Sequence, residues 1–142
     1  MRRLLLLLPF TAACALFEDS TPREELVRRR ARWEALGIRD YDFTFRRVCY
    51  CLPEDVQRVR VEVRAGSIAR IVNRQTGEPV VSSDRWPTVD SLFVWTERHF
   101  EDGYRITLDF DEVHHFPTRV TGDIPQYADD EFDYLSSEFV RR

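Results

Sequence analysis

Strict alternation between apolar and polar residues is the feature that most limits how this chain can fold. Tyr41, Phe43 and Phe45, for example, are each followed by a polar residue. Side chains on a strand alternate between its two faces, so this pattern predicts strands with one buried side. Gly66 and Ser67 are expected to form a hairpin turn. The predicted strands are residues 41–46, 58–65, 68–73, 104–111, 116–123 and 131–139.

Two other segments have helical spacing. The first begins at Thr21, which suits an N-cap, with Pro22 in the first turn and Glu24 at the capping-box position. The second begins near Thr88 or Asp90. The apolar stripes expected to face a sheet are Leu26, Val27, Ala31, Trp33, Ala35 and Ile38 in the first helix and Val89, Leu92, Phe93, Thr96 and Phe100 in the second.

The predicted order is helix, three strands, helix, three strands, in a chain of 142 residues, which is enough for one domain. Strands that are apolar on one face need a cover, and two amphipathic helices can supply it. We therefore expect an α+β fold, a two-layer sandwich in which two helices cover an antiparallel sheet of about six strands. The single domain is expected to span residues 21–142.

Residues 1–13 resemble a lipoprotein signal peptide, with basic Arg2 and Arg3, a short apolar run, and small residues just before Cys14. The run is shorter than the roughly 20 residues that span a bilayer. We expect removal of this segment, a lipid on Cys14, a tether over residues 14–20, and export to the cell envelope with anchoring to a membrane. The alternative is an ordinary secretory signal that leaves Cys14 as an incidental thiol.

The charge of the chain argues against nucleic acid as a partner. The chain has 21 basic and 25 acidic residues, and without Arg2 and Arg3 the count is 19 against 25, a formal charge of −6. Nucleic-acid-binding domains are normally basic. The first helix nevertheless carries a row of arginines, which either faces water or lies against anionic headgroups. This row is Arg23, Arg28, Arg29, Arg30 and Arg32.

Cys49-Tyr50-Cys51 is the most unusual local sequence. In an extended strand, residues two apart have Cα atoms about 6.6 Å apart and parallel side chains, so a disulfide between these cysteines requires a bend. The following Leu52-Pro53 is compatible with one. Three interpretations remain open: a local disulfide clamp, a redox-active pair, or half of a soft-metal site.

Histidines and carboxylates offer weaker candidates. His114 and His115 follow several acidic residues and could bind a metal. Neighbouring residues of a strand point to opposite faces, however, and a solvated hairpin loop is the better explanation of these histidines. His99 is expected on the flank of the second helix. The acidic residues 129–131 with Asp133 lack the ligand spacing of a calcium loop. The sequence shows no known catalytic signature, and no cofactor is expected.

The chain resembles a family of small bacterial exported proteins known only as domain of unknown function 6174. The matching elements span roughly residues 31–140, and the family supplies no functional residues. His115-Phe116 stands where the family usually has Gly-Tyr, which argues against an obligatory positive φ at that turn. The elements are Tyr41 to Phe45, Cys49-Tyr50-Cys51-Leu52-Pro53, Thr88 to Phe93, Phe110-Asp111, His115-Phe116-Pro117-Thr118 and Asp129-Asp130-Glu131.

These observations favour a non-enzymatic lipoprotein that binds an envelope protein or cell-wall material through its sheet or an aromatic edge. An exposed cluster of Trp86, Trp95 or Tyr127 would support this binding function, because large apolar patches on a protein surface usually mark contact sites. The alternative is a thiol-redox or metal-handling protein that uses Cys49 and Cys51. A hydrolase would need a pocket of acid, base and nucleophile, which the sequence does not display.

Overall fold

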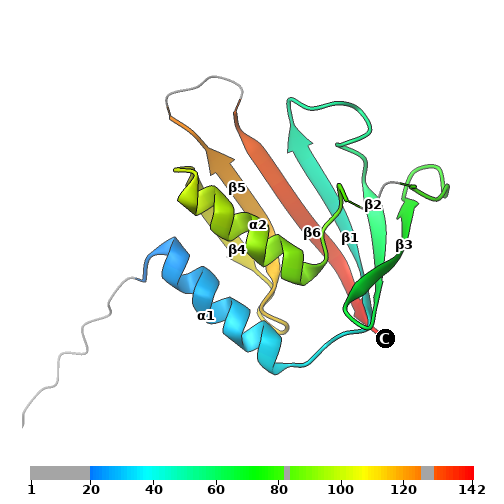
Figure 1. Cartoon of the computed structure of the whole chain (residues 1–142), viewed down its shortest axis with the longest axis horizontal. Helices are drawn as coiled ribbons and strands as arrows, with labels where there is room; N and C mark the ends of the chain where they lie inside the picture. The colour runs from blue at the N-terminus through cyan, green and yellow to red at the C-terminus, as the bar shows by residue number, and fades with distance from the viewer. Residues whose placement is uncertain (1–19, 82–83, 126–129) are drawn as a thin grey trace, which may run out of the picture.

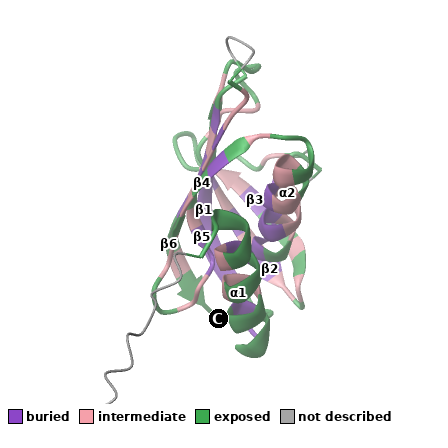
Figure 2. Ribbon diagram, turned by 90° about the vertical axis from the view of Figure 1, so that its left-hand side faces the viewer, coloured by how far each residue is buried: buried purple, intermediate pink, exposed green. Residues whose placement is uncertain are grey.

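The computed structural model describes residues 20–81, 84–125 and 130–142. Two helices lie across one face of a single sheet (Figure 1). Figure 2 shows both helices on the same side of that sheet, with the buried residues between the two layers. The expected α+β class and element order are confirmed. The elements are α1 (Pro22–Ala35), β1 (Tyr41–Cys49), β2 (Val59–Arg64), β3 (Ser67–Asn73), α2 (Val89–Glu101), β4 (Arg105–Phe110), β5 (Pro117–Asp123) and β6 (Phe132–Arg141).

The sheet has the strand order β3-β2-β1-β6-β5-β4, and each pair of neighbours is antiparallel. Hairpins join β2 to β3 and β4 to β5, whereas the central pair joins the first strand of the chain to the last. The expected turn at Gly66 and Ser67 is wrong by one residue. Ala65 and Gly66 form it with φ of 51° and 79°, and a two-residue hairpin turn favours such positive angles.

The apolar faces of β1 and β2 meet the helices, and Tyr41, Phe43 and Phe45 are fully buried there. The expected stripe of α2 is confirmed, since Val89, Leu92, Phe93 and Thr96 are all buried and Phe100 is partly buried. The expected stripe of α1 is only partly right. Leu26, Trp33 and Ile38 are buried, but Val27 is 57% exposed and Ala31 and Ala35 are exposed.

Fewer residues of α1 than expected are buried against the sheet, and helix geometry explains which ones are. Leu26 and Trp33 are seven residues apart and therefore lie on one side of the helix. The Trp33 ring meets the edges of Tyr41 and Phe116, and its Nε1 donates to Asp90 Oδ1 at 3.1 Å. Capping is as predicted, because Thr21 and Glu24 bond reciprocally at the start of α1.

A β-bulge in β6 changes which residues face the helices. Thr44 pairs with Ser137 but Asp42 pairs with Val140, so two residues of β6 lie opposite one residue of β1. Glu138 has a φ of 52° at this point. The extra residue moves Phe139 to the helix side and directs the Glu138 carboxylate to the opposite face, where it accepts a bond from Thr44.

Candidate functional site

The segment of residues 48–52, here called the tip, comprises the last two residues of β1 and the three residues that follow the strand. The Sγ atoms of Cys49 and Cys51 lie at disulfide-bonding distance, and the Cα atoms are 5.2 Å apart. An extended strand would separate them by about 6.6 Å, so the chain bends here as the sequence required. Tyr50 is 92% exposed, and Leu52 and Val48 are 59% and 39% exposed. The tip therefore presents apolar side chains to solvent.

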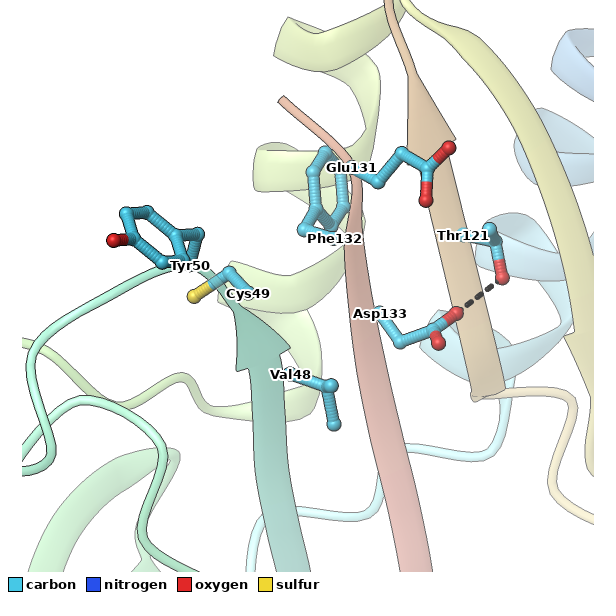
Figure 3. A pocket seen from close by; sticks show the side chains of 7 residues that line it. All are labelled: Val48, Cys49, Tyr50, Thr121, Glu131, Phe132 and Asp133. Atoms are coloured by element: carbon cyan, nitrogen blue, oxygen red, sulfur yellow. Dashed lines mark hydrogen bonds between the residues drawn. The ribbon is translucent and has the colours of Figure 1, made fainter. Parts of the chain in front are cut away.

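A recess of about 260 Å³ is lined by residues of the tip and of the start of β6, which pair with one another in the sheet (Figure 3). Phe132 lies in the middle of this view, with Tyr50 on the far side of Cys49 from Asp133. The Asp133 carboxylate accepts from Thr121 Oγ1 at 2.5 Å and from Arg119 at 3.3 Å, so its charge is already compensated. The residues that line the recess are Val48, Cys49, Tyr50, Thr121, Glu131, Phe132 and Asp133.

A second recess of about 300 Å³ shares Cys49, Tyr50, Glu131 and Phe132 with the first and is lined in addition by Cys51, Arg47, Asp130 and Tyr134. The guanidinium of Arg47 lies 5.4 Å from the ring centre of Tyr134 and 5.6 Å from that of Trp95. Arg47 is thus a fixed cation beside the disulfide. Alternation from Tyr41 and Phe45 already places residue 47 on the helix side of β1, a signal that sequence analysis could have used.

His99 belongs to this cluster and does not lie on an open flank. Its ring centre is 4.4 Å from that of Phe132, and its Nε2 is 3.0 Å from the Tyr134 hydroxyl oxygen. Burial lowers the pKa of His99, Arg47 lowers it further, and Asp102 acts in the opposite direction. Burial raises the pKa of Tyr134. At neutral pH both side chains are therefore uncharged, which suits a structural hydrogen bond.

The two adjacent histidines in the β4–β5 loop have separate partners. His114 Nδ1 is 3.1 Å from Asp111 Oδ1, and its ring packs on Phe139 with centres 4.6 Å apart. His115 Nδ1 is instead 3.3 Å from Arg29. Both side chains are partly buried, so they do not form the open solvated loop that was one expectation.

The inference that a positive φ is not obligatory at this turn is wrong, because His115 itself has a φ of 66°. Its backbone N–H donates to the Asp111 carbonyl at 2.9 Å, and the Asp111 side chain accepts from the N–H groups of Val113 and His114. These hydrogen bonds stabilise the left-handed backbone conformation of His115 and offset the steric strain that its Cβ causes. The glycine usual in the family is therefore compatible with the same turn.

Across the three described stretches, no group of three or more His, Cys, Asp or Glu side chains is placed to hold a metal ion. Asp133 pairs with Arg119, and Glu131 is exposed at the edge of the first recess. Asp129, Tyr127 and the expected lipidation residue Cys14 lie outside the described residues. Within the described part, no helix is long and apolar enough to cross a membrane.

The exposed aromatic cluster that would have supported a binding protein is not formed by the two tryptophans, and Tyr127 lies outside the described residues. Trp86 is 3% exposed and meets Phe45 edge to face, with ring centres 6.2 Å apart. Trp95 is partly buried under Arg47. Both indoles therefore belong to the layer between α2 and the sheet. Tyr50, which sequence analysis named only as the residue between two cysteines, is the aromatic side chain that faces solvent.

The arginines of α1 do not form a common basic face. Arg29 points inward with a side chain only 14% exposed, because its guanidinium lies over the Phe110 ring and bonds Glu25 and Glu112. Most of the others have carboxylate partners, which leaves little free charge for a membrane. These pairs are Arg23 with Glu97, Arg28 with Glu25, and Arg30 with Glu34.

The comparisons with known proteins add a family and nothing more. A model described as a family of unknown function (DUF6174) matches residues 25–141. No curated protein and no solved structure matches the chain. The match covers the whole sheet and both helices except the first residues of α1. The chain therefore belongs to this family of unknown function.

Proposed function

We propose that this protein is an exported lipoprotein, anchored to a cell-envelope membrane by a lipid on Cys14, and that it binds a partner protein through the tip. The leader-like residues 1–13 support the export and the anchor. The observation that supports the contact site is Tyr50, which is 92% exposed between two cysteines at disulfide distance.

The geometry of the tip suits binding for an energetic reason. A partner that orders a flexible loop loses about 0.5–1.5 kcal/mol for each side chain immobilised. The Cys49–Cys51 bond constrains the backbone beforehand, so less of this cost remains at association. Tyrosine has few rotatable bonds and combines a large apolar ring with a hydroxyl, and it recurs at the centre of protein interfaces. Leu52 and Val48 extend the apolar contact area.

Site-specific crosslinking in the native envelope tests the contact site. A photoreactive residue at position 52 should give a discrete crosslinked product in the parent and lose most of it in Tyr50→Ala. Val113→Ala is a matched control, because Val113 is 71% exposed on the β4–β5 loop, away from the tip. Equal crosslinking in Tyr50→Ala and the parent would overturn the contact site.

Mass spectrometry tests the anchor separately. The mature chain should begin at Cys14 and carry acyl chains, and Cys14→Ser should release the protein from the membrane fraction. A chain with an intact Met1, or an unmodified Cys14 on a protein that fractionates away from membranes, would overturn the lipoprotein assignment. Neither result bears on the tip.

Thiol–disulfide exchange is the second candidate, favoured by the exposure of Cys51 and by Arg47 beside both cysteines. A partner thiolate would attack one sulfur and form a mixed disulfide, and the released thiolate would be stabilised by the nearby cation. A second thiol on the partner would then complete the exchange and leave both cysteines reduced. In the reverse reaction, the Cys49 thiolate attacks a partner disulfide, a partner thiolate leaves, and Cys51 then resolves the mixed disulfide. Cys51→Ser removes this resolving thiol and should trap the mixed disulfide, whereas Tyr50→Ala should leave the exchange unchanged.

A further inference from the structure

A recess with three arginines lies on the helix-free side of the sheet, where β1, β2 and β3 approach their connecting loops. Its volume is about 460 Å³. Arg46 belongs to β1, Arg58 precedes β2 and Arg74 follows β3, so the sheet brings together cations from three parts of the chain. Pro53, Val56, Gln57 and Gln75 complete the lining, which includes no carboxylate.

One carboxylate lies beside these arginines. Glu138 Oε1 is 3.0 Å from Arg58 Nη2, and Oε2 is 3.2 Å from Arg74 Nη2. A bond from the Thr44 hydroxyl lowers the pKa of Glu138, and the two arginines lower it further, while burial acts in the opposite direction. Arg46 pairs with Leu135 through the backbone, but within the described part its side chain makes no hydrogen bond or ion pair with another residue. Three guanidinium groups thus share a single negative charge, which leaves two positive charges.

A neighbouring cluster on the helix-free side of the sheet also contains three arginines, but there a buried carboxylate compensates their charge. Asp42 is only 2% exposed, and its carboxylate accepts from Arg60, Arg64 and Arg142 at 2.5, 2.8 and 2.7 Å. There, one anion lies among three guanidinium groups and bonds all of them. In the recess, Glu138 reaches only two of the three from one side.

We propose that Arg46, Arg58 and Arg74 bind the phosphate group of a ligand as a dianion. The two uncompensated positive charges match the two negative charges of a phosphate monoester. Guanidinium groups bind phosphate oxygens through paired N–H donors, and the amides of Gln57 and Gln75 supply further donors at the same recess. A single carboxylate would compensate only half of this charge.

Titration of the purified full chain with inorganic phosphate at constant ionic strength, followed by calorimetry, tests the site. Arg46→Gln should weaken binding on the order of tenfold, the loss expected for one charge-assisted contact. Arg105→Gln is the matched control, because Arg105 is exposed on β4 at the far edge of the sheet and the change in net charge is the same. Glu138→Gln should strengthen binding, since it removes the carboxylate that competes for two of the arginines.

Three results would overturn the site: no saturable binding of phosphate, equal weakening in Arg46→Gln and Arg105→Gln, or weaker binding in Glu138→Gln. The first and second would mean that phosphate meets only diffuse surface charge. Vesicles of phosphatidate and of phosphatidylcholine then separate the sources of the phosphate group. Tighter binding to phosphatidate that Arg46→Gln abolishes supports the site with a lipid headgroup as ligand, while binding of inorganic phosphate alone supports it with a soluble phosphate ester.

Discussion

Gly122 and Phe132 lie opposite one another on β5 and β6, and the Phe132 ring occupies the space that a side chain at position 122 would need. A Cβ on Gly122 would be 2.3 Å from Phe132 Cε1 and 2.4 Å from Cζ. Non-bonded carbon atoms prefer about 3.5–4.0 Å, so the ring or the strand must move by about 1 Å. The ring has little freedom, because His99 and Tyr134 pack against it with centres 4.4 and 4.6 Å away.

Gly122→Ala should therefore lower the free energy of unfolding. Overpacking of this kind costs about 1–3 kcal/mol. Alanine regains about 0.5–1 kcal/mol, because glycine loses more backbone entropy when a strand forms. The expected net loss is about 1–2 kcal/mol. No positive φ is involved at this glycine, so the clash alone is responsible.

Urea unfolding of the purified full chain measures this loss as a lower midpoint with an unchanged m-value. Phe132→Ala provides the control, because without the ring the same Gly122→Ala change should be neutral or stabilising. The two substitutions should therefore couple by about 1 kcal/mol or more. A Gly122→Ala variant as stable as the parent, or two changes with additive effects, would refute the close-packing argument.

Three further predictions concern stability. Burial raises the pKa of Asp42, but hydrogen bonds from three arginines outweigh burial and hold the pKa at about 2, below the usual 3.8. The contribution of the Asp42 carboxylate to the free energy of unfolding is therefore complete above pH 3.8 and is lost as the pH falls through about 2. Asp42→Asn should thus cost about 2 kcal/mol at pH 7, and urea unfolding at a series of pH values should show the difference shrinking in acid. Because His115 has a φ of 66°, His115→Gly should be more stable than His115→Ala by about 1 kcal/mol and should unfold at a higher thermal midpoint. Equal midpoints of the two variants would contradict backbone strain at this position. Trp33→Phe should destabilise by about 1–2 kcal/mol, because it leaves Asp90 without its 3.1 Å bond from the indole; chemical denaturation that showed no change would contradict this.

Much of the candidate site could be located from sequence, but its shape could not. The cysteine pair was identified as unusual, and the bend that it requires is present in the tip. The exposure of Tyr50 and the burial of Trp86 were not foreseen, because both depend on where β1 and α2 lie relative to one another. His99 was expected on the flank of the second helix, but its contact with Tyr134 was not foreseen, since Tyr134 is 35 residues further along the chain.

The amino-acid sequence by itself determined the elements and most of their buried faces. A strand has a repeat of two residues and a helix of about 3.6, so a local pattern of apolar residues is enough to identify each element and its inner side. Only the tertiary structure decided that the first and last strands pair at the centre of the sheet, that a bulge at Glu138 reverses the alternation of β6, and that distant arginines converge. These outcomes depend on contacts between residues in different elements, up to 100 positions apart in the case of Tyr41 and Arg141, and no local periodicity encodes such contacts.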